Sequence, residues 1–130
     1  MATIERFEDL EVWQKARELC KKIFLLTEKE MFSRDFSLKD QIKRSSGSGM
    51  DNIAEGFERG GKKEFIQFLY ISKSSIAETK SQLYRALDYN YITQSEFDET
   101  YADCNDIAKM LMGLIKYLDK SEYKGIKFQR

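Results

Sequence analysis

The stretch QIKRSSGSGMDNIAEGF, residues 41–57, decides the fold. From just before it, small or apolar residues recur at steps of three and four, the spacing of one helical face: Leu38, Ile42, Ser45, Gly49, Ile53 and Gly56. Glycine inside a helix costs roughly 1 kcal/mol relative to alanine, so we expect a neighbouring helix to approach closely here. The alternative is a loop over Ser46–Gly49, but the apolar period resumes in phase at Ile53, which favours the helix.

The rest of the chain continues this pattern. Its 130 residues fit one domain, contain no proline, and alternate long periodic runs with short polar or glycine breaks. The pattern predicts an all-α, up-down-up-down antiparallel four-helix bundle. Helices are expected at about 9–29, 38–57, 62–89 and 94–118, with a tail at 119–130 that is either frayed or docked on a neighbour.

The helix ends carry recognisable signals. Residues 37–40 and 93–96 are typical of capping boxes, and Asn90 fits a left-handed helix stop. Gly60-Gly61 lacks the other residues of a phosphate-binding loop and is interpreted as a turn between helices. The phenylalanines of the 31–36 connection are expected to plug one end of the bundle.

Two of the predicted helices, 9–29 and 62–89, carry apolar stripes that look too wide for one bundle to cover. On the second of these, Phe68, Ile71, Ser75 and Gln82 form a stripe beside the main seam. We therefore expect identical copies of the chain to associate.

The composition excludes several chemistries. The chain has no histidine, which removes serine–histidine and cysteine–histidine nucleophile pairs and makes a tetrahedral zinc site very improbable. Cys20 and Cys104 fit small buried thiols. Asp51, Glu55 and Glu58 lie one turn apart and could hold a divalent cation in an enzyme, but a solvated row of charges is favoured. We predict no catalytic residue, cofactor, metal or small-molecule substrate.

Six basic residues form the candidate nucleic-acid-binding patch: Lys39, Lys43, Arg44, Arg59, Lys62 and Lys63. The alternative is ordinary surface charge, and a net charge of zero gives no support to a bulk attraction for polyanions. The first residues hold acids where a signal peptide needs an apolar core, and no run reaches membrane-spanning length. These features predict a cytoplasmic protein with no membrane partner.

The motifs QIKR (41–44), DNIAEGF (51–57) and EFIQFLYISKSS (64–75), with Phe7, Leu10, Trp13 and Ala16, resemble a family of small bacterial proteins. These are the 23S ribosomal RNA intervening-sequence proteins. The resemblance assigns structural roles to the motif residues: Gln41, Asn52, Ile53, Ala54, Glu55, Gly56, Phe65 and Phe68.

The resemblance also implies a ring, expected to be a homopentamer, and kinship with the accessory protein of diversity-generating retroelements, which binds nucleic acid and a reverse transcriptase. Most members have no established activity. Two functions stay open: a non-enzymatic oligomeric scaffold whose candidate partners are RNA or a nucleic-acid enzyme, and a protein-interaction adaptor with no nucleic acid involved.

Overall fold

The computed structural model describes residues 4–121, and within that range the regular structure is entirely helical. A 3-10 turn, η1 (Phe7–Asp9), precedes the α-helices of this part of the chain: α1 (Glu11–Thr27), α2 (Glu30–Arg34), α3 (Phe36–Arg59), α4 (Lys62–Asp88) and α5 (Gln94–Lys120). Most of the expected tail, from residue 122 on, lies outside the described residues.

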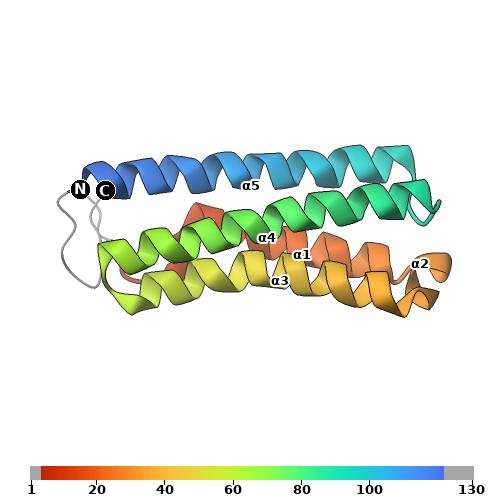
Figure 1. Cartoon of the computed structure of the whole chain (residues 1–130), viewed down its shortest axis with the longest axis horizontal. Helices are drawn as coiled ribbons and strands as arrows, with labels where there is room; N and C mark the ends of the chain where they lie inside the picture. The colour runs from red at the N-terminus through yellow and green to blue at the C-terminus, as the bar shows by residue number, and fades with distance from the viewer. Residues whose placement is uncertain (1–3, 122–130) are drawn as a thin grey trace.

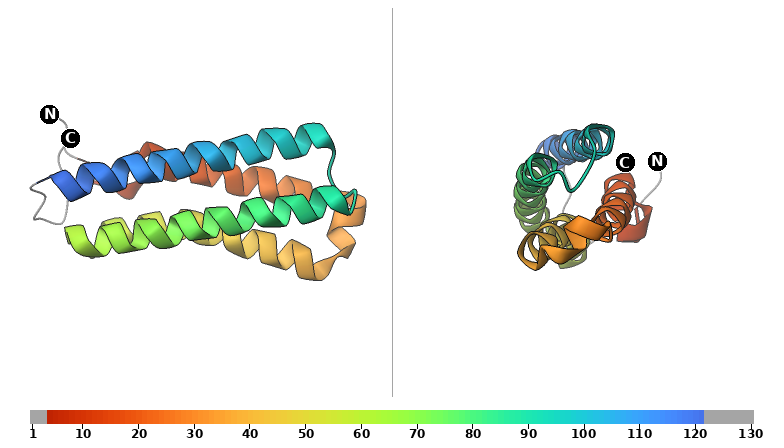
Figure 2. Two further views of the ribbon diagram at one scale, coloured as in Figure 1. Left: turned by 45° about the horizontal axis from the view of Figure 1, so that its top comes forward. Right: turned by 90° about the vertical axis from the view of Figure 1, so that its right-hand side faces the viewer.

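The four long helices lie side by side as a bundle, and α2 lies at one end of it (Figure 1). The connections between successive long helices alternate between the two ends of the bundle (Figure 1). Seen end-on, α1 is flanked by α3 and α5, while α4 lies between α3 and α5 (Figure 2). Among the four neighbouring pairs of long helices, the α3–α4 interface is the most extensive and the α1–α5 interface the least.

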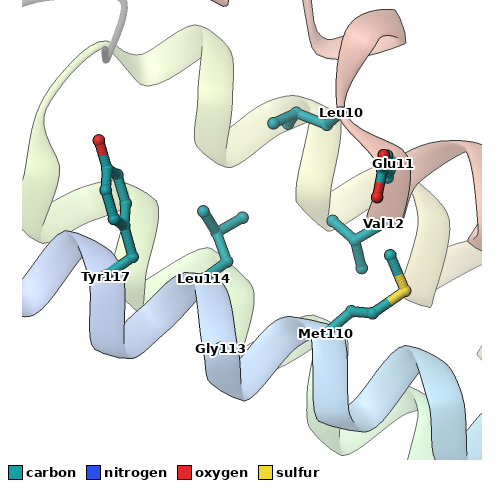
Figure 3. A pocket seen from close by; sticks show the side chains of 7 residues that line it. All are labelled: Leu10, Glu11, Val12, Met110, Gly113, Leu114 and Tyr117. Carbon is teal, nitrogen blue, oxygen red and sulfur yellow. The ribbon is translucent and has the colours of Figure 1, made fainter. Parts of the chain in front are cut away.

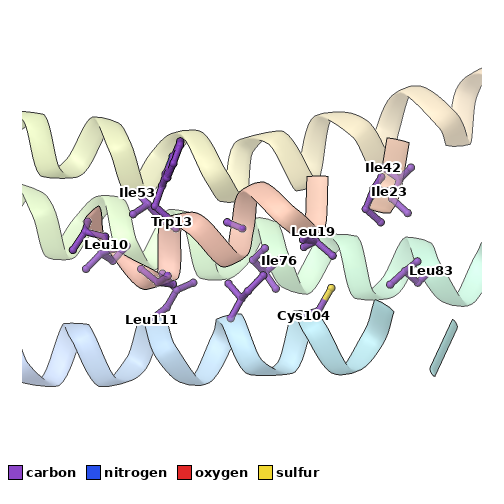
Figure 4. Close-up of a cluster of buried hydrophobic side chains, with 14 of the residues drawn as sticks. Leu10, Trp13, Leu19, Ile23, Ile42, Ile53, Ile76, Leu83, Cys104 and Leu111 are labelled. Carbon is purple, nitrogen blue, oxygen red and sulfur yellow. The ribbon is translucent and has the colours of Figure 1, made fainter. Parts of the chain in front are cut away.

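Apolar side chains from all four long helices meet along the bundle axis (Figure 4). Leu19, Ile53, Ile76 and Leu111 contribute one residue from each helix, and none is more than 1% exposed. Burying such a side chain stabilises the fold by about 1.5–3 kcal/mol. The core positions follow the three- and four-residue steps of the sequence, so the helical interpretation of those steps is confirmed.

Helix α3 runs without a break through Ser46–Gly49, so the loop alternative is wrong. The expected close approach occurs at Gly49, where an added Cβ would lie 2.6 Å from Ile76 Cδ1, and at Gly56, where it would lie 2.6 Å from Phe68 Cβ. Gly47 differs, because a Cβ there would meet nothing within 4 Å. Two of the glycines in α3 are thus explained by packing, and Gly47 is not.

The start of α3 differs from the prediction. Asp35 is the N-cap, and its Oδ1 accepts a hydrogen bond from the Leu38 amide at 3.0 Å. Ser37 lies inside the helix, so the capping box predicted at residues 37–40 is wrong. An aspartate is as good an N-cap as a serine, and Asp35 is held in place by a hydrogen bond from the Tyr91 hydroxyl (2.9 Å).

Fewer phenylalanines close this end of the bundle than predicted. Phe32 is fully buried and stacks on Tyr91 with 5.3 Å between ring centroids. Phe36, in contrast, is the first residue of α3 and is 78% exposed, whereas Leu38 in the same turn is the residue that reaches the core. Only one of these two phenylalanines closes the bundle.

The remaining helix ends agree with the stop and capping residues identified in the sequence. Gly60 ends α3 in the left-handed conformation (φ 86°), and Asn90 follows α4 with φ 62°. Thr93 and Glu96 form the predicted capping box: Thr93 Oγ1 accepts from the Glu96 amide at 3.1 Å, and Glu96 Oε1 accepts from the Thr93 amide at 2.8 Å. Within residues 4–121, none of the helices combines the length and apolarity that crossing a bilayer requires.

Candidate functional site

The six basic residues of the candidate patch fall into two groups. Lys39, Lys43 and Arg44 lie in the first half of α3, whereas Arg59, Lys62 and Lys63 flank the Gly60-Gly61 connection. A rise of 1.5 Å per residue places Lys39 and Arg59 roughly 30 Å apart. One copy of the chain therefore does not bring the six side chains together.

Several of these cations already have a partner within the protomer, and for three of them the partner is a carboxylate. Three form ion pairs: Lys39 with Glu28 (3.1 Å), Arg44 with Asp40 (2.8 Å) and Arg59 with Glu55 (3.2 Å). Lys62 Nζ donates to the backbone oxygens of Asp119 (3.4 Å) and Ser121 (3.0 Å), near the end of α5. Lys43 lies over the ring of Phe24, 5.5 Å from its centroid. Most of the candidate patch thus has a partner within the protomer.

Five of the eight residues assigned structural roles by the family motif lie along the α3–α4 interface or in the core: Gln41, Ile53, Gly56, Phe65 and Phe68. Ile53 and Phe65 are fully buried, and Gly56 lets Phe68 approach α3. Gln41 Oε1 accepts from Arg85 Nη1 of α4 at 3.1 Å. The other members stay on α3: Asn52 Nδ2 donates to Ser48, Glu55 pairs with Arg59, and Ala54 is half-buried.

A set of hydroxyl contacts joins α3 to α4 and was not predicted from the sequence. We call it the hydroxyl ladder: Ser45 with Thr79 (2.7 Å) and Gln82 (2.6 Å), Ser48 with Ser75 (2.8 Å), and Ser72 with the Gly49 carbonyl (2.6 Å). Ser75 and Gln82 were expected to leave surface uncovered, but both are buried against α3. Of that second stripe, Ile71 is exposed. The signal was the run of small polar residues at three- and four-residue steps on both helices.

The hydroxyl ladder holds no general base that could activate its serines as nucleophiles. Ser45 contacts a hydroxyl and an amide oxygen, neither of which is a general base. Among residues 4–121, every buried side-chain nitrogen and oxygen has a hydrogen-bond partner. The serines are therefore structural.

The two thiols are poor nucleophiles. Burial raises the pKa of the Cys104 thiol to about 12, and Cys104 is fully buried. Burial also raises the pKa of Cys20, whose Sγ donates to the Ser46 carbonyl at 3.3 Å. The raised pKa values keep both thiols protonated, and the reactive form of cysteine is the thiolate. Over the same stretch of chain, no group of three acids or thiols is arranged to hold a metal ion.

The acidic start of α5 pairs with three lysines spaced seven residues apart, of which two lie on α1 and the third, Lys29, follows its end. Lys22 Nζ lies 2.6 Å from Asp103 and 3.4 Å from Glu99. Lys15 lies 3.6 Å from Asp106, and Lys29 pairs with Glu96. The hydrogen bond to Asp103 raises the pKa of Lys22. These ion pairs link the acid-rich half of α5 to α1 and to the residue that caps α2.

Toward the other end of α5, an apolar groove of about 410 Å³ opens between α1 and α5 (Figure 3). Leu10 and Val12 line it from one side and Met110, Leu114 and Tyr117 from the other. A second apolar surface, formed by Cys20, Phe24, Leu25 and Met50, lies over α1 and α3. These surfaces have the character of contact sites rather than of a catalytic centre.

Comparison with known families fits this fold and these motif positions. The profile of the 23S rRNA-intervening sequence protein family matches residues 8–113. The chain belongs to this family. No curated protein matches the sequence.

A solved structure agrees with the family assignment. It is the crystal structure of a protein of unknown function from the S23 ribosomal protein family of Bacteroides thetaiotaomicron VPI-5482. The two chains are 29% identical, the match covers 81% of this intervening-sequence family member and 98% of the other chain, and the TM-score is 0.72. The likeness therefore extends over almost the whole of a relative whose function is unknown.

Proposed function

We propose that the chain is a non-enzymatic scaffold: an up-down-up-down antiparallel bundle that assembles into a ring-like homo-oligomer, a pentamer, in the cytoplasm. The observation that carries this proposal is the exposure of large hydrophobic side chains. Those between 38% and 78% exposed are Phe24, Leu25, Met31, Phe36, Tyr70, Ile71, Tyr84, Tyr89 and Tyr117. Monomeric soluble proteins rarely expose contiguous apolar patches of large area, and such patches mark contact sites.

The distribution of these side chains supports a ring over a two-fold dimer. Leu25 lies on α1, Ile71 on α4 and Tyr117 on α5, so they do not share one face. A two-fold dimer uses the same patch on both copies, whereas a ring joins two different patches on each. The protonated thiols and the fully bonded hydroxyl ladder support the non-enzymatic part of the proposal.

Light scattering coupled to gel filtration tests the assembly. The wild-type chain is expected to elute at five times the protomer mass of 15.3 kDa. Leu25→Asp, at a side chain that is 67% exposed, should lower that mass without changing the helical content. A matched control is Ser74→Asp, at an exposed residue of α4. A stable wild-type monomer at micromolar concentration would contradict the proposal.

RNA or a nucleic-acid-processing protein is the proposed partner, and the proposed kinship with retroelement accessory proteins supports that choice. The adaptor with no nucleic acid is the second candidate, favoured by the zero net charge and by the ion pairs of Lys39, Arg44 and Arg59. RNA binding measured at 25 mM salt separates the two, since phosphate contacts are strongest at low salt.

A further inference from the structure

A stripe of tyrosines and lysines runs along the outer surface of α4. It consists of Tyr70, Lys73, Ala77, Lys80 and Tyr84, at alternating steps of three and four, so all five lie on one face of the helix. Tyr70 is 49% exposed and Tyr84 48%, and the two lysines between them are partly exposed. We call this set the tyrosine–lysine stripe.

Helix α5 supports one end of the stripe. The Tyr84 ring lies 4.8 Å from that of Phe97 and 5.5 Å from that of Tyr101, centroid to centroid. Lys80 Nζ lies 4.8 Å from the centroid of the Tyr101 ring. These contacts fix the orientation of Tyr84 and Lys80 before any ligand binds, which lowers the entropic cost of binding.

The charges of the stripe distinguish it from the patch predicted on α3. Within residues 4–121, neither Lys73 nor Lys80 has a carboxylate in ion-pair range, whereas Lys39, Arg44 and Arg59 all do. Two unneutralised cations between exposed aromatic rings attract an anionic ligand that has flat, apolar faces. Exposed tyrosines also occur at interfaces between proteins, but lysine is depleted there, so the two lysines between the rings favour a nucleic-acid ligand over a second copy of the chain.

We propose that the tyrosine–lysine stripe binds single-stranded nucleic acid, with bases stacking on Tyr70 and Tyr84 and phosphates contacting Lys73 and Lys80. This inference rests on the nucleic-acid partner of the proposed function and moves the contact from α3 to α4. Stacking on aromatic rings beside a basic track is how proteins hold single strands without reading sequence. Tyr84 lies 14 residues after Tyr70, a separation of about 21 Å along the helix, room for several nucleotides.

Fluorescence polarisation tests the proposal with a 15-nucleotide single-stranded RNA of mixed sequence, at 25 and 200 mM salt. Lys73→Gln combined with Lys80→Gln should weaken binding about tenfold at the lower salt. It should also reduce the slope of log affinity against log salt by about 1.4, since each single-strand phosphate contact contributes about 0.7. Tyr70→Leu should weaken binding about fivefold or more through lost stacking.

Matched controls separate this site from general surface charge. Lys39→Gln combined with Arg44→Gln removes the same charge from α3 and should change the affinity less than twofold. Asp98→Asn removes an acid that lies one turn from Tyr101 on α5, and it should tighten binding. A duplex of the same sequence should compete poorly because its bases are not available to stack, while single-stranded DNA should compete well.

The RNA-binding experiments can fail without contradicting the scaffold proposal, which light scattering tests separately. Loss of affinity in the stripe variants, with the α3 control unchanged, supports the inference. Equal losses of affinity in the stripe variants and in the α3 control would overturn the inference, as would the absence of RNA binding by the wild type. Neither result would contradict the scaffold proposal if light scattering shows an oligomer. A change in oligomer mass in the stripe variants, without an effect on RNA, would show that a second copy occupies the stripe and would also overturn it.

Discussion

Gly56 and Phe68 are so close that a Cβ on the glycine would lie 2.6 Å from the Cβ of the phenylalanine. Such a contact cannot be relieved by a change of rotamer, because the Cβ of Phe68 is attached directly to the α4 backbone. The two helices touch here with no space for a methyl group.

Gly56→Ala should therefore destabilise the fold by about 1–3 kcal/mol, the usual effect of overpacking. Gly47→Ala is the matched control, because a Cβ there meets nothing within 4 Å. The control should stabilise the chain by up to about 1 kcal/mol through helix propensity alone. Urea denaturation followed by circular dichroism measures both, and shifts of the same sign would contradict the argument.

Ser45→Ala tests the hydroxyl ladder. The Ser45 hydroxyl is shared by Thr79 and Gln82, and all three side chains are buried. Its removal leaves the buried Gln82 Oε1 short of a partner, while Thr79 keeps its hydrogen bond to the Ser75 carbonyl, and the loss should cost about 1–3 kcal/mol. Ser74→Ala, at an exposed residue of α4, should stay within about 0.5 kcal/mol of wild type. Similar melting curves for the two variants would show that the ladder is dispensable.

The hydrogen bonds of Glu96 should make the stability of the fold depend on pH. Hydrogen bonds from Lys29 and from the Thr93 amide lower the pKa of its carboxyl group in the folded chain. The unfolded group titrates near pH 4.3, so these bonds stabilise the fold above that pH, and their contribution is lost as the pH falls through the folded-state pKa. In Glu96→Gln the glutamine preserves the capping box. The variant should melt below wild type at pH 7, and the difference should shrink toward pH 3; a constant difference would refute this cause.

The two thiols should differ in reactivity. Cys104 is fully buried, and burial raises its pKa to about 12, so it should not react with a thiol reagent while the chain is folded. Cys20 is only partly buried and should react slowly. Cys20→Ser should abolish the reaction of the folded chain, and guanidinium should then expose the remaining thiol. Rapid labelling of Cys104 in the folded variant would contradict this placement.

The helices could be predicted from the sequence because the apolar period is regular. Ile42, Ile53, Ile76 and Leu111 all occur at steps of three and four and all reach the core. The start of α3 was harder, because Asp35 and Ser37 are both good caps and the choice depends on Tyr91, which is distant in sequence. Local signals cannot resolve a choice that a tertiary contact decides.

The candidate site was less predictable for the same reason. Residue type identified Lys39, Arg44 and Arg59 as cations, but whether a cation is available depends on the carboxylate beside it in space. Lys73 and Lys80 looked like ordinary residues of an amphipathic helix. Their position between exposed tyrosines becomes apparent only when the face of α4 that is turned outward is known.

The hydroxyl ladder has a consequence for how α3 and α4 are aligned. Purely aliphatic helices can slide past each other with little penalty, because one methyl group replaces another. Here, a shift of one turn would separate Ser45 from Gln82, Ser48 from Ser75 and Ser72 from the Gly49 carbonyl at the same time. The polar contacts therefore favour a single register of α3 against α4. The same register sets the distances between surface residues that lie on different helices of this pair.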